Sequence, residues 1–135
     1  MARIGNFPIW PRPVRQFMRS LGVSAEGMAK EQQFIEVIAR NLANAETTRT
    51  PEGGPYKREV AVSDNSGTQV VEDKRPGRLV YDPGHPHANA DGFVEYPNVD
   101  INSELVDMMI ARRVHEANAT VFQAAKAMLK RALEI

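Results

Sequence analysis

Apolar residues recur at heptad spacing in the last third of the chain. One row steps by four and three residues and a second row runs beside it; the rows are Ile110, Val114, Ala117, Val121, Ala124 and Met128, and Phe122, Ala125, Leu129 and Ala132. This spacing predicts a helix over 103–135 with the seam of a coiled coil along the first row. Because one partner helix cannot cover two adjacent apolar rows, we expect more than one packing partner.

The charges of this segment agree with a helix. Asn102 or Ser103 is the predicted N-cap, acidic residues follow it, and basic residues stand near the end. That order complements the helix dipole at both ends.

A similar rhythm predicts a second helix over 21–45. Its apolar positions, interrupted by Ser24 and Glu31, are Leu21, Met28, Ile35, Ile38, Leu42 and Ala45. Asn44 stands near its predicted end, where asparagine tolerates a left-handed cap conformation. The two helices are expected to return alongside each other as an antiparallel pair that leaves apolar surface uncovered.

The segment between the helices, 46–102, holds six prolines and six glycines. Such a composition opposes helix and favours turns and short strands. We predict strands over 56–62, 68–72, 78–81 and 92–96, which gives an α+β fold with a small β-rich outer module between the helical ends. Its few apolar residues make a weak core by themselves.

Residues 1–20 form a Pro/Arg-rich arm in this interpretation. Prolines surround Trp10, and Arg3 and Arg12 belong to a stretch without an acidic residue before Glu26. Two alternatives stay open: an irregular or polyproline-like arm, because dense proline blocks regular structure, or an arm that docks on a neighbouring subunit with Trp10 as its anchor.

Charge and composition exclude several classes. The 17 basic and 17 acidic side chains give no net charge, so the broad basic field of a nucleic-acid binder is absent. No cysteine is present for a disulfide, a thiol nucleophile or a Cys-based zinc site. No apolar run approaches the ~20 residues that span a bilayer, so no direct membrane insertion is expected. No apolar segment follows Met1, so we expect synthesis as a soluble protein without a cleaved signal peptide.

Candidate chemistry is sparse. His85 and His87 flank Pro86 with the character of metal ligands, but no motif supplies a third or fourth ligand. Gly53-Gly54 lacks the Lys-Ser/Thr of a phosphate loop, and no G-x-S-x-G nucleophile motif occurs. We therefore expect no catalytic residue, no metal and no cofactor. A metal-dependent hydrolase using the two histidines remains an alternative from another class.

Polar residues interrupt both helices. Asn41 and Asn44 share a face of the first helix, and Glu116 and Asn118 break the second. These side chains either face water or are hydrogen-bonded between helices, where they would fix register and partner.

Several motifs resemble one family. The stretch 41–56, Asn-Leu-Ala-Asn-Ala-Glu-Thr-Thr-Arg-Thr-Pro-Glu-Gly-Gly-Pro-Tyr, is similar to the signature of bacterial flagellar rod and hook proteins. The segments 82–86, 90–94, 97–100, 116–118 and 126–135 also resemble that family in order and spacing, with 97–100 closest to the proximal-rod type. Three features depart from it: residues 1–17 precede the usual start, Gly22 and Gly27 loosen the first helix, and His115 replaces an aromatic residue.

The resemblance implies a subunit of a hollow helical drive shaft in the periplasmic part of the flagellar basal body. Its helical ends would form an inner coiled-coil domain and its β-module would contact neighbours. The implied partners are copies of itself, other rod and MS-ring-junction proteins, and the flagellar type III export apparatus. Another rod or hook paralogue, or a soluble coiled-coil adaptor, is the alternative.

We predict polymerisation coupled to folding of the terminal helices, with two sets of interface residues. The helical set is Leu21, Met28, Ile35, Ile38, Asn41, Leu42, Asn44, Ile110, Val114, Ala117, Asn118, Val121, Phe122, Ala125, Met128 and Leu129. The set on the module and arm is Trp10, Tyr56, Phe93 and Tyr96.

Overall fold

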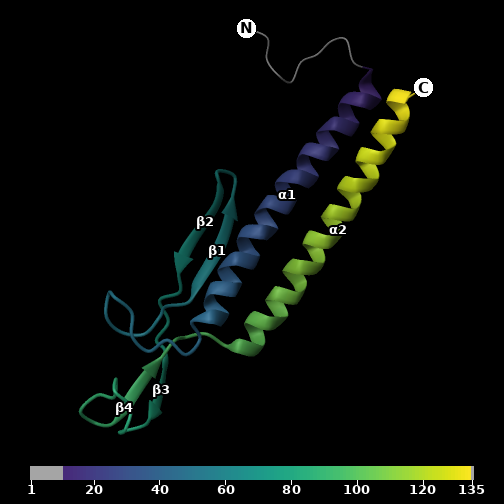
Figure 1. Ribbon diagram of the computed structural model, residues 1–135. Helices are drawn as coiled ribbons and strands as arrows, with labels where there is room; N and C mark the ends of the chain where they lie inside the picture. Colours follow the sequence, from purple (N-terminus) through teal and green to yellow (C-terminus); the bar gives the residue numbers. More distant parts are fainter. Residues whose placement is uncertain (1–10, 135) are drawn as a thin grey trace.

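Two long helices run antiparallel beside each other, and two small sheets lie between them in the sequence. The computed structural model describes residues 11–134, with α1 over Arg12–Ala43 and α2 over Ile101–Glu134. Figure 1 shows the helices side by side along their length, with the start of α1 and the end of α2 at the same end of the pair. The α+β fold is as predicted.

Helix α1 begins at Arg12, well before the predicted start at Leu21, so the proposed arm over 1–20 is wrong for its second half. Pro11 stands at the N-cap and Pro13 in the first turn. Proline is accepted there because the first-turn N–H groups have no partner within the helix and its fixed φ already suits the helix. Residues 1–10, including Trp10, lie outside the described residues.

The C-terminus of α1 and the N-terminus of α2 are capped differently from the prediction. Asp100, rather than Asn102 or Ser103, caps α2: its Oδ1 accepts from the backbone N–H of Asn102 at 3.0 Å and of Ser103 at 3.3 Å. Asn44 does follow α1, but with φ −106° and ψ 15° instead of the left-handed conformation. Its side chain donates to the Arg40 carbonyl at 2.9 Å and so satisfies one of the terminal carbonyls.

The β-rich segment contains two separate antiparallel hairpins. Strands β1 (Glu59–Asp64) and β2 (Gly67–Glu72) pair with each other, as do β3 (Arg78–Tyr81) and β4 (Phe93–Tyr96). Within residues 11–134 no strand pairing joins the two sheets. The β1–β2 hairpin lies along α1, while β3–β4 lies beyond the end of the helices (Figure 1).

The first strand is displaced from its predicted position at 56–62. It starts at Glu59 because the residues before it have other partners: the Tyr56 N–H donates to the Thr47 carbonyl at 2.9 Å, and the Arg58 N–H to the Asn98 side chain at 3.0 Å. A tight turn follows β1, in which Asp64 Oδ1 accepts from the Ser66 N–H at 2.7 Å.

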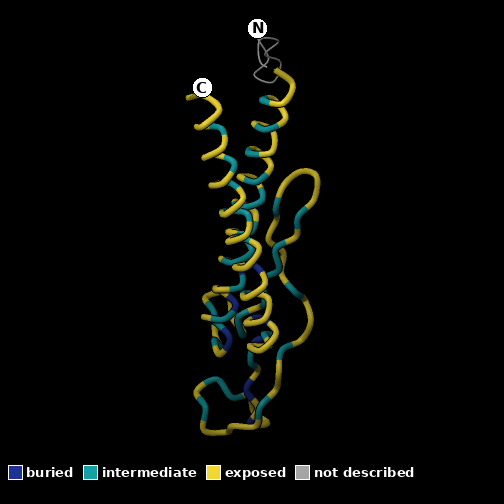
Figure 2. The backbone as a smooth tube through the Cα atoms, turned by 90° about the vertical axis from the view of Figure 1, so that its right-hand side faces the viewer, coloured by how far each residue is buried: buried dark blue, intermediate teal, exposed yellow. Residues whose placement is uncertain are grey.

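Buried residues cluster at the end of the helical pair that meets the sheets. The buried residues of the helices and their ends are Val37, Asn41, Ala45, Glu104 and Ala111, and Val94 is buried in β4. Among the described residues, none of α1 before Val37 and none of α2 after Ala111 is buried. The colours of Figure 2 show this asymmetry, with dark blue confined to the part of the molecule near the sheets. The other half of the helical pair is therefore a two-helix hairpin without a core.

Candidate subunit-assembly surfaces

The face of α1 that packs on α2 is the predicted one. Leu21, Met28, Ile35, Ile38 and Leu42 are all half-buried at their heptad spacing, and Ala45 is buried just beyond the helix. The sequence therefore identified the inner face of α1 correctly.

The α2 face that packs on α1 contains Phe122, Ala125 and Leu129 of the second predicted row, whereas the fourth residue of that row, Ala132, is exposed. It follows a four-three rhythm from Glu104 through Met108, Ala111, His115, Asn118, Phe122, Ala125 and Leu129, all half-buried or buried. A Cβ built on Gly27 of α1 would lie 3.2 Å from Asn118 Nδ2, which shows how closely the two helices approach there. Phe122, Ala125, Asn118 and Leu129 thus pack within the chain.

The first predicted row of α2 lies on the outside of the helical pair. We call it the outer stripe: Ile110, Val114, Ala117, Val121, Ala124 and Met128, all exposed. Ile110 and Val121 are each 57% exposed and Met128 is 63% exposed. A continuous apolar row at coiled-coil spacing on a solvent-facing surface is typical of a protein–protein contact.

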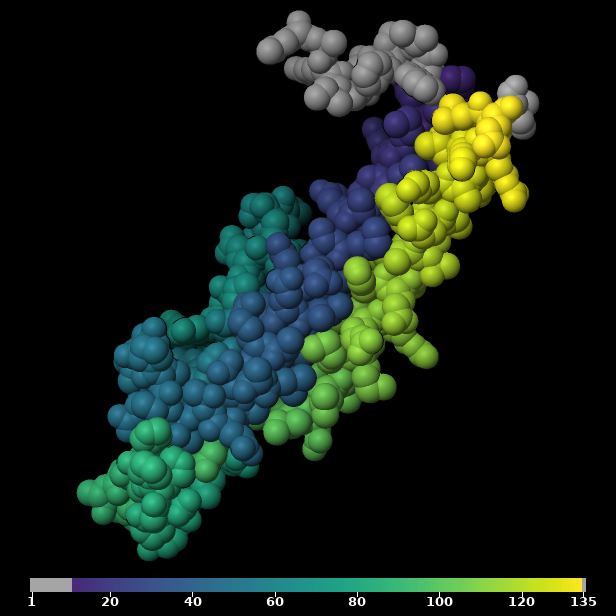
Figure 3. Space-filling model, viewed as in Figure 1, coloured from purple at the N-terminus to yellow at the C-terminus, as the bar shows by residue number. Residues whose placement is uncertain are grey.

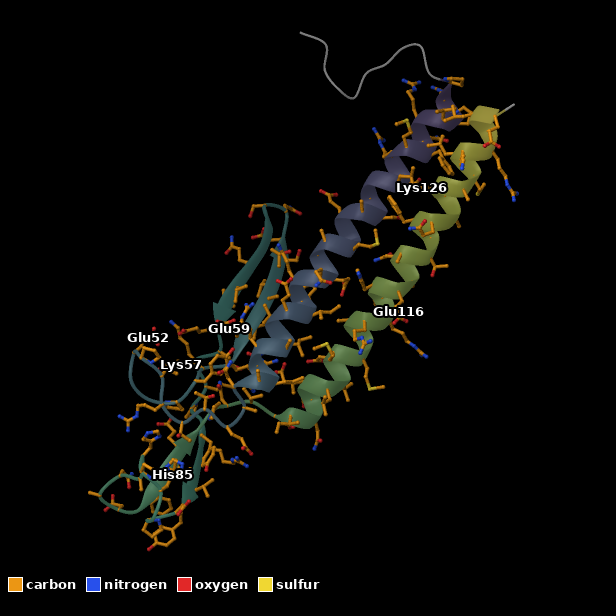
Figure 4. All side chains as sticks on the ribbon, viewed as in Figure 1. Glu52, Lys57, Glu59, His85, Glu116 and Lys126 are labelled. Atoms are coloured by element: carbon orange, nitrogen blue, oxygen red, sulfur yellow. The ribbon has the colours of Figure 1, made fainter. Side chains whose placement is uncertain are left out.

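The most deeply buried polar side chains of the described residues form a cluster where α1, the first hairpin and α2 meet. We call it the polar junction: Asn41, Tyr56, Arg58, Glu59, Asp73, Asn98 and Glu104. Asn41 and Glu104 are each 1% exposed. Figure 4 labels Glu59, which lies near the end of α1 where β1 begins.

Asn41 uses its whole side-chain amide at this junction. Its Nδ2 donates to the Glu59 carbonyl at 2.8 Å and to Glu104 Oε2 at 3.3 Å. Its Oδ1 accepts from the Tyr56 hydroxyl and from the Glu59 N–H, both at 2.9 Å. Of the two alternatives left open for Asn41, the buried and hydrogen-bonded one holds, and these bonds fix α1 against the first hairpin.

The Glu104 carboxylate is neutralised by Arg58. Arg58 Nε donates to Glu104 Oε1, and its Nη1 donates to Asp73 Oδ2 at 3.3 Å. Asn98 completes the group by donating from Nδ2 to the Asp73 carbonyl at 3.1 Å. A buried charge is tolerated because it is paired and hydrogen-bonded.

Two side chains of the junction have shifted pKa values. Burial removes water from the Tyr56 phenolate and the nearby Glu59 charge opposes it, which together raise the pKa of Tyr56 to about 12. Hydrogen bonds from the Arg75 side chain and backbone hold the pKa of the Asp73 carboxyl well below its usual range. Tyr56, predicted as a surface contact, therefore acts inside the chain.

The roles of Arg58 and Glu104 were not apparent from the sequence. An acidic residue in the first turn of a helix is expected from the helix dipole, so Glu104 did not stand out. Arg58 lay within a predicted strand. The one available signal was that Glu104 falls on the same heptad row as Ala111 and Asn118.

A groove of about 300 Å³ lies between α1, β1 and α2 beside the junction. Phe34, Val37 and Ile38 line it from α1, and Ile110 and Val114 of the outer stripe line it from α2. The groove and the outer stripe are therefore continuous.

The β3–β4 hairpin presents aromatic surface. The rings of Tyr81 and Phe93 pack edge to face with centroids 5.3 Å apart, and Phe93 is 39% exposed. Tyr96 is half-buried, with the Arg78 guanidinium 5.1 Å from its ring centroid. The hairpin projects from the end of the molecule, as the space-filling view shows (Figure 3).

The two histidines flagged in the sequence bond to each other and to the segment that follows α1. His87 Nδ1 lies 2.7 Å from Thr48 Oγ1, and the His87 N–H donates to His85 Nδ1 at 3.0 Å. In the part of the chain that the structure describes, no three histidine, cysteine, aspartate or glutamate side chains gather as a metal site would require.

The helices are also unlike membrane spans. None of those between residues 11 and 134 combines the length and the apolar character needed to cross a bilayer.

A helical hairpin with an uncovered coiled-coil stripe, locked to a β-hairpin by a buried polar cluster, defines a class of structural assembly subunits. Comparison with known proteins specifies the class. Residues 90–135 match the family described as "Flagellar basal body rod FlgEFG protein C-terminal".

Full-length relatives agree with that match. The flagellar basal-body rod proteins FlgC of Borreliella burgdorferi and Bacillus subtilis are each 37% identical to this chain, over 86% of it and 95% of the relative. The FlgC of Escherichia coli O6:H1 is 34% identical, over 84% of this chain and 92% of the relative. The chain belongs to the FlgC family of flagellar basal-body rod proteins, and it is a structural subunit of the rod in the basal body.

Proposed function

We propose that this subunit enters the rod by polymerisation through the outer stripe of α2, and that the half of the helical pair without a core becomes stably ordered as neighbouring subunits cover it. The observation that carries the proposal is the solvent-facing heptad row from Ile110 to Met128. Its partners are copies of the chain and other rod proteins, and its role is structural rather than catalytic.

The energetics support coupling between order and assembly. Full burial of a Val, Ile or Met side chain contributes about 1.5–3 kcal/mol, so covering a residue that is still half exposed contributes about 1 kcal/mol. Several such residues along one helix give an appreciable sum. Against it stands the entropy of fixing residues, about 1–2 kcal/mol each for the backbone. A two-helix hairpin without buried side chains cannot offset that cost alone.

The wider account follows the family resemblance. Head-to-tail contacts that do not close into a ring generate a helical tube. We propose that this tube is the hollow proximal part of the rod in the periplasm, joined to the MS ring, and that the flagellar type III apparatus exports the subunit without cleaving a signal peptide. The β3–β4 hairpin, with Phe93 exposed, would contact neighbouring subunits.

The test is a charge placed on the outer stripe. Val121→Asp should leave the monomer's unfolding midpoint nearly unchanged, because the side chain is already 57% exposed, but should abolish polymerisation and motility. Gln123→Asp, an exposed polar position on the same helix, is the matched control. Sedimentation velocity of the purified chain and a swimming assay give the two readouts. Normal rods carrying Val121→Asp would refute the assignment of the stripe.

A further inference from the structure

The groove between α1, β1 and α2 has an apolar floor and acidic edges. Phe34 and Ile38 of α1 form apolar floor, with Ile110 and Val114 of α2 opposite them. A volume of about 300 Å³ is at the lower end of the range for built binding pockets. It is sufficient for one or two large side chains.

Of the acidic side chains that line this groove, two form salt bridges within residues 11–134 and two do not. Glu59 is paired with Arg40 at 2.9 Å, and Glu104 with Arg58. Glu31 and Asp107 also line the groove, and neither forms a salt bridge with any residue in the described part of the chain. The groove therefore presents two carboxylates without a partner beside an apolar surface.

One segment of this chain has the complementary character. Residues 3–12 read Arg-Ile-Gly-Asn-Phe-Pro-Ile-Trp-Pro-Arg, with apolar and aromatic residues between two arginines and no acidic residue. Tryptophan and arginine are the side chains most enriched in the energetically dominant contacts of protein interfaces. Arginine also pairs well with a carboxylate.

Geometry decides which copy can supply the segment. Trp10 precedes the start of α1 at Arg12 by two residues, a reach of at most about 7 Å. Glu31, the residue on the groove nearest that end of α1, lies about 28 Å along the helix from Arg12. The groove is therefore out of reach of the chain's own Trp10 and accessible only to that of another copy.

We infer that the groove between α1, β1 and α2 receives residues 3–12 of a neighbouring copy, with Trp10 against Phe34, Ile38, Ile110 and Val114 and with arginines beside Glu31 and Asp107. This inference rests on the proposed polymerisation and names the contact that links one copy to the next. It requires the donating copy to be displaced along the helices by tens of ångströms, since residue 10 precedes the first residue of α1 in the sequence and the groove lies near the other end of that helix.

The composition of the chain makes the contact directly measurable. The chain has no cysteine, and Trp10 is its one tryptophan. Ile9 is the residue next to Trp10. Ile9→Cys chains mixed with Ile110→Cys chains under oxidising conditions should form a disulfide-linked heterodimer during polymerisation, because the proposed contact brings these positions within the short distance that a disulfide needs. Ile9→Cys mixed with Glu52→Cys, an exposed position that does not line the groove, should not. Trp10 fluorescence should shift to shorter wavelength as subunits associate.

A charge swap tests specificity. Glu31→Lys with Asp107→Lys should lower the heterodimer yield about tenfold, because two attractive contacts become repulsive. Adding Arg3→Glu and Arg12→Glu to the chain that donates residues 3–12 should restore the yield. The matched control, Glu26→Lys with Glu116→Lys, makes the same change in net charge at exposed positions that do not line the groove and should have little effect.

The outcomes separate this inference from the proposed polymerisation. Polymerisation by sedimentation, with Trp10 emission unchanged and no disulfide between Ile9→Cys and Ile110→Cys chains, would overturn the groove assignment and leave the proposed function standing. Absence of any association would overturn both. Crosslinking that survives the charge reversal would overturn the pairing of arginine with Glu31 and Asp107.

Discussion

Removing Arg58 should cost this chain far more stability than removing another arginine that also bridges two elements. Arg58→Met leaves the Glu104 carboxylate, 1% exposed, without a counter-charge. Breaking a buried ion pair from one side costs about 3–5 kcal/mol, and because the Arg58 side chain is itself 21% exposed we expect about 3 kcal/mol. That value lowers the folded-to-unfolded ratio about a hundredfold.

Arg40→Met is the control for this prediction. Arg40 pairs with Glu59 at 2.9 Å, but the two side chains are 47% and 28% exposed, so solvent screening limits the loss to at most about 1 kcal/mol. Urea unfolding followed by circular dichroism gives both values from the transition midpoints. The double variant Arg58→Met with Glu104→Met should recover most of the lost stability, because the buried charge is then absent. Equal midpoints for the two single arginine variants would refute the view that the junction holds the fold together.

Three further outcomes follow from individual side chains. Tyr56→Phe should remove part of the loss of stability at alkaline pH. The pKa of Tyr56 is raised to about 12 in the folded chain, so the unfolded chain loses this proton first and the stability of the wild type falls as pH rises from about 10 toward 12. Thermal melts of the two proteins across that pH range would show the difference. Asp73→Asn should destabilise the folded chain at neutral pH and progressively less in acid. The pKa of Asp73 is lowered in the folded chain, so the stabilising contribution of its carboxylate is lost as pH falls below about 4. A difference in stability between variant and wild type that does not change with pH would contradict this. Gly27→Leu should cost about 1–3 kcal/mol in urea unfolding by forcing Asn118 and the helices apart. Gly22→Leu, where a Cβ meets nothing within 4 Å, should stabilise α1 by up to about 1 kcal/mol, and similar losses at both glycines would refute the close approach.

The sequence predicted the positions of the helices and hairpins better than it predicted which side of α2 packs on α1. Heptad spacing located both helices, and turn residues located the hairpins, because both signals are local. The face of α2 toward α1 was not predictable, since its two apolar rows lie one residue apart and so differ by about 100° of rotation. Glu104 decides between them: held by Arg58, it turns the row of Ala111 and Phe122 toward α1 and leaves Val121 outside.

Other errors came from competition between local rules. Proline density predicted irregular structure before Leu21, but Pro11 and Pro13 occupy the cap and first turn, where a helix accepts them. Asp100, Asn102 and Ser103 could each have capped α2, and the backbone geometry selected Asp100. Such choices depend on where the chain comes from and goes, which spacing alone does not specify.

The hydrogen bonds that meet at Asn41 have a consequence for the proposed assembly as a whole. Its four hydrogen bonds join α1 to the start of β1, to Tyr56 and to α2, and so help to fix the angles at which these elements meet. A lattice of many identical units accumulates any variation in the shape of its building block. In the proposed polymer, a single amide that is 1% exposed would therefore help to determine how straight and how stiff the tube can be.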